Sequence, residues 1–274
     1  MKIVFLDAKT IGDDIDLSGF DSLGEVTKYN FTTPEEAPER VKDADVLIIN
    51  KVPINENSVG TAKILKLVCV TATGTNNLDK NYLDSHKIAW RNVAGYSTET
   101  VTQHTFAMLF YLLEKLRYYD DYVKDGNYIN DTSFTHFAEH FSEINGKTWG
   151  IIGLGAIGVK VANTATHLGM EVLGYDPYIS VNAAWNLSRG VKHVQDVTEI
   201  YKECDYITVH VPLMDSTKKM ISKEAIAMMK PTAVVLNFAR DLLVDEDAVI
   251  KALEEKKIRK YVSDFPNTKT VGKP

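Results

Sequence analysis

The sequence predicts an α/β fold made of two doubly wound parallel-sheet domains, and three observations point to it. Short apolar runs of the buried-strand type alternate with segments of helical pattern in both halves of the chain. The run at residues 148–152 leads directly into a glycine-spaced turn and an amphipathic segment. After Ser97 the pattern changes to a nearly continuous apolar stretch, which divides the chain into residues 1–97 and 98–274. A chain of 274 residues is long enough for two such domains.

The first domain is predicted from short apolar runs that charged or helical segments separate. The expected strands lie at residues 2–6, 46–49, 67–70 and 88–93. Strands that are apolar on both faces and alternate with helices are typical of a parallel sheet with helices on both sides. We therefore expect residues 1–97 to form one parallel α/β domain.

The second domain is predicted to begin with a long linking helix and to continue as another α/β series. The helix is expected over residues 99–118, with apolar residues on nearly all its sides. Such a helix is buried on most sides, either between domains or in a subunit interface. Further strands are expected at residues 148–152, 171–175, 206–212, 233–240 and 261–265, and a charged, exposed helix at residues 248–257.

Composition argues against several classes of partner. The net charge of −6 disfavours a nucleic acid or an anionic membrane surface. No apolar run approaches the length that spans a bilayer, and the first residues are typical of a strand rather than a signal peptide. Cys69 and Cys204 lie far apart in apolar runs, which favours free thiols in a reducing compartment over a disulfide. We expect a cytoplasmic protein with no bound metal.

The glycine-spaced turn after residues 148–152 has the spacing of a dinucleotide fingerprint. Gly153 permits a tight turn, Gly155 lets the backbone approach a pyrophosphate, and Gly158 lets a helix pack closely on a strand. The free N–H groups at the start of the following helix favour a negatively charged group. The alternative is a structural glycine turn without any ligand, but the strand before it and the helix after it favour nucleotide binding. Asp176, at the end of the next strand, is placed to bind a ribose.

Polar residues at other strand ends carry the remaining expectations. In open α/β sheets, ligands bind beyond the carboxyl ends of the strands, at the point where the strand order reverses. Pro212, Arg240 and Asp264 occupy such ends. An arginine after an apolar strand suits an anionic substrate, because a guanidinium group holds a carboxylate by two parallel hydrogen bonds. The alternative for Arg240 is a solvated charge.

Several motifs together resemble one family. They are residues 73–79, 92–97, 153–158, 210–213 with Thr217, 236–240, and Asp264, and they occur in the family's order over nearly the whole chain. The chain resembles the D-isomer-specific 2-hydroxyacid dehydrogenases, which include glycerate, phosphoglycerate, D-lactate and formate dehydrogenases. The resemblance implies a flavodoxin-like substrate-binding domain over residues 1–97, a Rossmann NAD-binding domain over residues 98–274, an active site in the cleft, and a homodimer built on the cofactor domain.

The resemblance also implies roles for individual residues. Asp176 favours NAD, because a carboxylate there accepts hydrogen bonds from the ribose and repels a 2′-phosphate. Arg240 is implied to be the catalytic arginine that binds and polarises a 2-oxo or 2-hydroxy acid during hydride transfer. The substrate is implied to contact Thr73, Gly74 and Arg240. Phosphoglycerate enzymes commonly carry Arg-Ser after the second strand, where this chain has Asn50 and Lys51. We count Lys51 as a further candidate for contact with an anionic substrate, and the alternative is a solvated charge. The cofactor is implied to contact Thr102, Gly153, Gly155, Ala156, Ile157, Gly158, Asp176, Pro212, Thr217, Phe238, Ala239, Arg240 and Asp264.

The sequence departs from the family after Asp264. A glutamate is expected a few residues later and an acid–base histidine about twenty residues further on, but the printed chain has no carboxylate after Asp264. The helix that returns to the first domain is also missing from the printed sequence, which suggests a loose first domain or dependence on a partner chain. We hypothesise an NAD-binding chain with impaired catalysis. The alternative is a non-catalytic NAD-binding protein on the same scaffold, like the family's corepressors.

None of the seven histidines matches the family's catalytic position. His104 and His210 are expected to pack or to form hydrogen bonds, and His136 and His140 lie in a polar loop. Residues up to about 147 resemble glycerate or hydroxypyruvate enzymes, and the chain from Gly150 resembles a phosphoglycerate dehydrogenase branch. A chimera, an engineered sequence and divergence all remain open. We place glycerate or hydroxypyruvate ahead of 3-phosphoglycerate as substrate.

Overall fold

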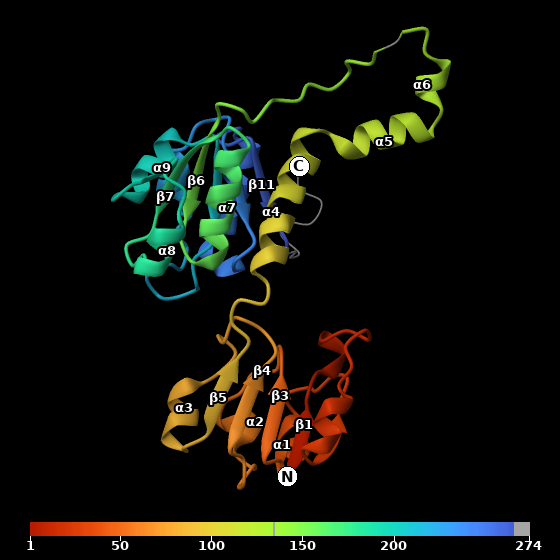
Figure 1. Ribbon diagram of the computed structural model, residues 1–274, viewed down its shortest axis with the longest axis vertical. Coiled ribbons are helices and arrows are strands. Elements are labelled where there is room, and N and C mark those ends of the chain that lie inside the picture. Colours follow the sequence, from red (N-terminus) through yellow and green to blue (C-terminus); the bar gives the residue numbers. More distant parts are fainter. Residues whose placement is uncertain (134, 266–274) are drawn as a thin grey trace. The chain divides into compact units, whose positions relative to one another are not determined.

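The computed structural model describes residues 1–133 and 135–265, and the chain divides into two compact units between Ser97 and Thr98 (Figure 1). Each unit is built around one parallel sheet. The predicted class, two parallel-sheet α/β domains, is therefore confirmed. Within the described ranges, no helix is both long and apolar enough to cross a membrane.

The first unit contains a five-stranded sheet in the order β2-β1-β3-β4-β5. This is the doubly wound order of flavodoxin-like domains. Its strands are β1 (Lys2–Phe5), β2 (Glu25–Lys28), β3 (Val46–Ile49), β4 (Leu67–Val70) and β5 (Ala89–Asn92). Its helices are α1 (Ala37–Val41), α2 (Glu56–Val59) and α3 (Lys80–Ser85), with short 3-10 turns at Ala8–Thr10 and Ser18–Ser22.

Strand β1 shows how both faces of this sheet are buried. Val4 and Leu6 belong to the larger apolar cluster on one face, and Ile3 and Phe5 to a smaller cluster on the other. Successive side chains of a strand point to opposite faces, so a strand covered on both sides is a continuous apolar run. Because of this continuous apolar run, β1 could be predicted from the sequence.

The sequence prediction omitted two edge strands, and both are polar. In β2, Val26 and Thr27 are half-buried and the two flanking residues are exposed. In β8 (Val191–His193), only Val191 is half-buried. An edge strand pairs on one side only and faces solvent more, so it needs no apolar run. The apolar pattern that revealed the central strands is therefore absent from these two.

The second unit contains a six-stranded sheet in the order β11-β10-β9-β6-β7-β8. This is the Rossmann order, in which the chain moves outward from β6 in one direction, returns, and continues from β9 in the other. Its remaining strands are β6 (Thr148–Ile152), β7 (Glu171–Tyr175), β9 (Tyr206–Val209), β10 (Val234–Asn237) and β11 (Lys260–Ser263).

Helices cover both faces of this sheet. Trp149 and Ile151 of β6 face the cluster formed with α4 and α7, whereas Ile152 belongs to the cluster on the opposite face. The helices are α4 (Thr98–Leu113), α5 (Leu116–Lys124), α6 (Asn127–Asn130), α7 (Ala156–His167), α8 (Val181–Asn186), α9 (Val197–Glu203), α10 (Lys223–Ala227) and α11 (Glu246–Glu254), with a 3-10 turn at Asp241–Leu243.

The single long helix expected over residues 99–118 is wrong. Helix α4 ends at Leu113, and Lys115 adopts a left-handed conformation (φ 54°) before α5 begins. In the single chain, α4 is buried along one stripe and Tyr111 is 47% exposed, and burial of its other sides in a subunit interface stays a prediction. Apolar composition alone could not show which side of the helix packs against α7.

Residues 116–133 and 135–147, which we call the arm, connect α4 to β6. Their described part is held together locally: the Tyr119 hydroxyl donates to the backbone oxygen of Glu139 (3.0 Å), and the Tyr118 hydroxyl lies 2.7 Å from Nε2 of His136. Ile129 and Phe137 are nevertheless 84% and 79% exposed. The arm thus presents large apolar side chains on its surface.

A buried hydrogen bond joins two central strands of the second unit, and it gives a stability prediction. The Trp149 indole N–H donates to the Thr208 hydroxyl (3.1 Å), and both residues are fully buried. Thr208→Val leaves this donor unsatisfied, so we expect the free energy of unfolding to fall by about 1–3 kcal/mol. Thr208→Ser keeps the hydroxyl and serves as the control. Denaturant titration followed by tryptophan fluorescence measures both variants, and equal stability of Thr208→Val and wild type would contradict the expectation.

Candidate functional site

The candidate site lies at the carboxyl-terminal edge of the second unit's sheet. The strand order reverses between β6 and β9, which are paired neighbours in the sheet. At such a reversal the loops diverge to opposite faces and leave a crevice. The predicted residues that follow strands at this edge are Gly153, Gly155, Ala156, Ile157, Gly158, Asp176, Pro212, Thr217, Phe238, Ala239, Arg240 and Asp264.

Gly153 lies where the chain that leaves β6 comes close to the chain that leaves β9. It has φ +96°, a conformation that L side chains rarely adopt. A Cβ atom there would lie 2.7 Å from the backbone oxygen of His210 and 2.8 Å from a methyl carbon of Val211. The turn after β6 therefore takes its shape only because residue 153 has no side chain.

The next two glycines differ in what surrounds them. A Cβ on Gly158 would lie 1.9 Å from the backbone oxygen of Gly153, so this glycine allows α7 to pack onto the turn. A Cβ on Gly155 would meet nothing within 4 Å, and the residue has an ordinary φ of −74°. The chain therefore does not need glycine at position 155 for packing. Open space beside a helix N-terminus suits the close approach of a phosphate group.

Asp176 fastens the end of β7 to the glycine turn. One carboxylate oxygen accepts from the Leu154 N–H (2.9 Å) and the other from the Tyr178 N–H (2.9 Å). A carboxylate has about four acceptor positions, so capacity remains for the hydroxyls of a ribose. The negative charge at this position disfavours a 2′-phosphate.

The loop after β9 is closed by Thr217. Its hydroxyl donates to the backbone oxygen of Pro212 (2.7 Å) and accepts from the Met214 N–H (2.9 Å). Just before this loop, Nε2 of His210 is buried and has no hydrogen-bond partner among the described residues. Burial lowers the pKa of His210 to about 4, so the imidazole is neutral near pH 7. A buried polar atom without a partner beside the crevice is a feature found at ligand sites.

Arg240 is positioned by a buried asparagine. Asn237 ends β10 and is fully buried, with its Nδ2 donating to the backbone oxygen of Arg240 (2.7 Å) and its Oδ1 accepting from the Ala239 N–H (3.2 Å). Phe238 is buried, and Arg240 is half-buried. The turn thus brings a guanidinium group to the sheet edge and holds its backbone by side-chain hydrogen bonds.

Asp264, just beyond β11, interacts electrostatically with two basic side chains. Partial burial raises the pKa of its carboxyl group, while the charges of His104 and Arg240 lower it. Thr102, on the same helix as His104, is buried and donates to the backbone oxygen of Thr98 (2.7 Å). The segment in which the sequence prediction sought a glutamate, from residue 266 onward, lies outside the described residues.

The expected substrate residues of the first unit also lie at one sheet edge. Lys51 follows β3 and Thr73 follows the adjacent strand β4. The Thr73 hydroxyl donates to the backbone oxygen of Val93 (3.2 Å), and the Thr73 carbonyl accepts from Asn92 (2.7 Å), which fixes the loop that contains Gly74. The three substrate residues predicted for this unit are thus gathered at one edge.

Asp7 fixes the position of Lys51. It is buried, and its carboxylate accepts from the backbone N–H groups of Asn50 (2.9 Å), Lys51 (2.6 Å) and Val52 (3.2 Å). Sequence reasoning missed this role, as it missed that of Asn237. Both residues carry the same signal, a polar side chain directly at the end of an apolar run.

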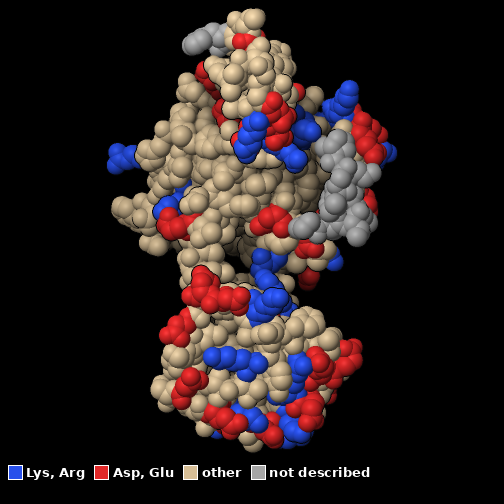
Figure 2. Space-filling view, turned by 90° about the vertical axis from the view of Figure 1, so that its right-hand side faces the viewer, with Lys and Arg blue, Asp and Glu red and all other residues tan. Residues whose placement is uncertain are grey.

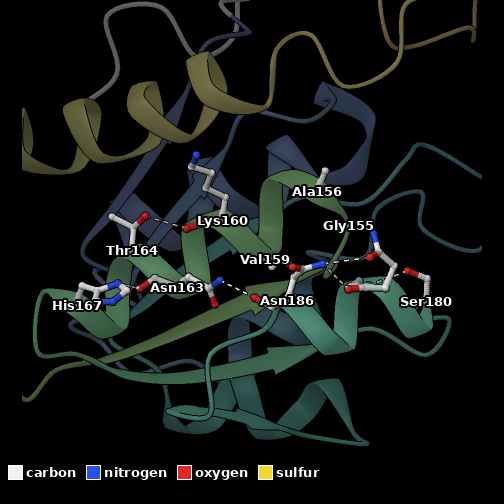
Figure 3. Close-up of a pocket in the computed structure, with 11 residues that line it drawn as sticks. Gly155, Ala156, Val159, Lys160, Asn163, Thr164, His167, Ser180 and Asn186 are labelled. Atoms are coloured by element: carbon white, nitrogen blue, oxygen red, sulfur yellow. Dashed lines mark hydrogen bonds between the residues drawn. The ribbon is translucent and has the colours of Figure 1, made fainter.

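A groove of about 600 Å³ lies between α7 and α8 (Figure 3). Gly155 and Ala156 border it, but most of its polar side chains already have partners. Asn163 donates to the backbone oxygen of Asn186 (2.8 Å), and Nδ1 of His167 lies 2.7 Å from the backbone oxygen of Asn163. Because a ligand site needs convergent polar groups that remain available, this groove fits a cofactor less well than the crevice does.

Comparison with known families agrees with the geometry in indicating a dinucleotide site in the second unit. The profile described as "D-isomer specific 2-hydroxyacid dehydrogenase, NAD binding domain" matches residues 106–272. A glycerate dehydrogenase of Methylorubrum extorquens is 35% identical over 93% of this chain and 77% of its own length. A D-3-phosphoglycerate dehydrogenase of Methanocaldococcus jannaschii is 34% identical over 89% of this chain and 45% of its own length.

A solved structure confirms the likeness in three dimensions. An acyclic imino acid reductase in complex with NADPH and D-Arg superposes with a TM-score of 0.85 at 29% identity. The superposition covers 98% of this chain and 85% of that one. That structure contains the phosphorylated form of the cofactor, so a protein of similar fold binds NADPH.

The contrast between Gly158 and Gly155 yields a paired prediction. Gly158→Ala forces a Cβ into the turn, and we expect the free energy of unfolding to fall by about 1–3 kcal/mol. Gly155→Ala enters open space, so stability should stay within about 0.5 kcal/mol of wild type. NADH affinity should instead fall at least about tenfold, because the new methyl group hinders the pyrophosphate. Denaturant titration and NADH fluorescence measure the two effects, and an unaffected NADH affinity in Gly155→Ala would contradict the assignment.

The neutral, buried His210 predicts a pH-dependent stability. Its folded-state pKa lies below the ordinary value of 6.5 at about 4. The unfolded chain therefore binds a proton that the folded chain does not, and stability falls as the pH drops. We expect His210 to account for a loss of about 2 kcal/mol between about pH 7 and about pH 5. His210→Gln cannot titrate, so its unfolding free energy should change less over this range. Identical pH profiles for the two proteins would show that folding does not lower the pKa of His210.

Proposed function

Because this chain belongs to the D-isomer-specific 2-hydroxyacid dehydrogenase family, we propose that it is an NAD-dependent oxidoreductase that acts on a small 2-hydroxy or 2-oxo acid. The observation that carries the proposal is the grouping at one sheet edge of the glycine turn, Asp176, Arg240 and Asp264. The glycine turn suits the phosphate groups of NAD, and Asp176 suits its ribose. Arg240 gives a cation for the substrate's carboxylate, and Asp264 gives a polar group for the nicotinamide carboxamide.

The residues fit the cofactor on structural grounds. Open space at Gly155 beside the start of α7 admits the pyrophosphate, and Asp176 retains acceptor capacity for the ribose. Thr102, Pro212, Thr217 and the run from Phe238 to Arg240 complete the proposed contacts. We assign NAD rather than the 2′-phosphorylated form because Asp176 carries a negative charge at the ribose position.

Substrate recognition is proposed to rest on charge. When bound, the nicotinamide supplies the hydride chemistry. Arg240 holds the substrate carboxylate by bidentate hydrogen bonds and polarises the carbonyl that is reduced. The backbone N–H groups around Thr73 and Gly74 offer further donors to the carboxylate, and Lys51 offers an ammonium group to a second anionic group. The glycerate or hydroxypyruvate type is preferred over 3-phosphoglycerate, because one exposed lysine is a modest phosphate site.

We assign residues 1–97 to substrate binding and residues 98–274 to NAD binding. A homodimer built on the second unit accounts for the apolar surface of the arm, where Ile129, Phe137 and Phe141 are 84%, 79% and 57% exposed. In Figure 2 much of the second unit's face carries neither Lys and Arg nor Asp and Glu, and depletion of charged residues is typical of interface cores. A cytoplasmic location without nucleic-acid or membrane partners accords with the net charge of −6.

The proposal predicts different effects on binding and on turnover at Arg240. Wild type should bind NADH and oxidise it only slowly in the presence of hydroxypyruvate, because none of its seven histidines matches the family's acid–base position. Arg240→Lys keeps the charge but loses the bidentate geometry, so kcat/KM should fall about 100-fold. NADH affinity should change far less, because Arg240→Lys leaves Phe238 and Ala239 unchanged and keeps the backbone at residue 240, which Asn237 holds.

Absorbance at the NADH band measures turnover, and fluorescence measures binding. Binding without any 2-oxo-acid turnover would favour the alternative of a non-catalytic NAD-binding protein on the same scaffold. Failure to bind NADH would contradict both the proposed oxidoreductase and the non-catalytic NAD-binding protein. An imino acid substrate serves as the comparison, and its preferential reduction would contradict the proposed substrate class.

A further inference from the structure

We propose that Asn50 selects substrates that carry a hydroxyl group on C3, such as glycerate and hydroxypyruvate, over acids that lack this group. The inference rests on the proposed function, because it requires that a 2-hydroxy or 2-oxo acid bind at the edge of the first sheet that carries Thr73 and Gly74. Asn50 is not among the expected substrate contacts, so this is a further role for that edge.

The side-chain oxygen of Asn50 is the observation that carries the inference. This Oδ1 atom is buried, and it has no hydrogen-bond partner among the described residues. The other end of the same amide has one, because Nδ2 donates to the backbone oxygen of Thr10 (3.4 Å). The opposite assignment of the amide would place two oxygens against each other. The amide thus presents an acceptor that lacks a donor.

Two neighbouring side chains hold the backbone from which this amide projects. Asp7 accepts from the N–H groups of Asn50 (2.9 Å), Lys51 (2.6 Å) and Val52 (3.2 Å). From the other side, Nδ2 of Asn77 donates to the backbone oxygens of Asn50 (3.3 Å) and Val52 (3.0 Å). Each backbone N–H of residues 50–52 therefore already donates within the chain, and the base of the Asn50 side chain is fixed relative to the sheet.

The loop proposed to hold the substrate carboxylate follows the adjacent strand. Strands β3 and β4 are paired; Asn50 comes directly after β3, and Thr73 and Gly74 come after β4. The bonds from Asn77 join the two loops. Adjacent strands lie about 4.8 Å apart, a spacing comparable to the length of a three-carbon acid from its carboxylate to its C3 hydroxyl. An acid held at Thr73 and Gly74 can therefore extend C3 toward Asn50.

A hydroxyl group is the C3 substituent that suits this oxygen. An amide oxygen accepts hydrogen bonds and cannot donate them. The C3 hydroxyl of glycerate supplies a donor, whereas the methyl group of lactate does not, and a phosphate group presents mainly acceptor oxygens. A site that binds a substrate hydroxyl rejects the analogue without it, because its own polar group is then left unpaired.

The amide of Asn50 can turn toward such a ligand at little cost. The torsion about its Cβ–Cγ bond has a broad minimum. The one hydrogen bond that the amide makes, to Thr10, is long. Asn50 as a whole is half-buried, so its side chain borders the surface even though Oδ1 is covered in the free chain.

The experiment measures the dissociation constants of D-glycerate and D-lactate for the full chain with NADH bound. Both ligands are already reduced at C2, so neither reacts with NADH, and isothermal titration calorimetry reports binding alone. Wild type should bind D-glycerate about tenfold more tightly than D-lactate, because the two acids differ only in the C3 hydroxyl.

Two substitutions at Asn50 separate the acceptor from the shape of the side chain. Asn50→Leu keeps a similar size without an acceptor, and the preference for D-glycerate should fall to about twofold or less. Asn50→Asp keeps an acceptor oxygen, and its charge acts on both acids alike, so a preference of at least about fivefold should remain.

Thr71→Val is the matched control. It removes a side-chain hydrogen bond to the backbone at the end of the same strand, from the Thr71 hydroxyl to Ile49 (3.2 Å), and leaves Asn50 unchanged. Its ratio of dissociation constants should stay within about twofold of that of wild type. Circular dichroism confirms that each variant is folded.

Three results are distinguishable. Equal affinities of wild type for the two acids would overturn the inference and leave the proposed function standing. A tenfold preference that persists in folded Asn50→Leu would assign the hydroxyl to another group and overturn the inference as well. Failure of wild type with bound NADH to bind either acid would contradict the proposed function itself.

Discussion

The candidate site depends on the close approach of two backbone segments where the strand order of the second sheet reverses. The glycine turn after β6 meets the chain that leaves β9, and the space for a side chain at Gly153 is filled by the backbone of His210. Gly158 allows α7 to press against the same turn. These contacts place the start of α7, and with it a set of free N–H groups, at the crevice. Asp176 then joins β7 to the turn through a hydrogen bond from the Leu154 N–H, so the proposed phosphate and ribose positions are fixed together.

Much of this arrangement could be predicted from the sequence, because its causes are local. Apolar runs revealed the central strands, and the spacing of three glycines revealed the turn. The edge strands β2 and β8 were missed because partial exposure removes the apolar pattern. The end of α4 at Leu113 was missed because the left-handed conformation of Lys115 has no sequence signal of its own. Asn237 and Asp7 act through bonds to residues outside their strands, and only the folded chain shows these partners.

Hydrogen bonds hold the charged groups of the candidate site in fixed positions. Backbone hydrogen bonds hold Asp176, and a buried asparagine orients the turn that carries Arg240, so these charges are fixed in place. Fixed charges need little reorganisation when an anionic substrate binds, which is a common source of transition-state stabilisation. Burial lowers the pKa of His210 to about 4, so its imidazole adds no charge to this region near pH 7.

The central claim is that the glycine turn of the second unit is the cofactor site, and a crystal structure of this chain grown with NADH tests it most directly. The account predicts pyrophosphate oxygens that accept from the backbone N–H groups of Ala156 and Ile157, with the adenosine ribose at Asp176. Density for the cofactor in the groove between α7 and α8, or elsewhere with an empty glycine turn, would contradict it.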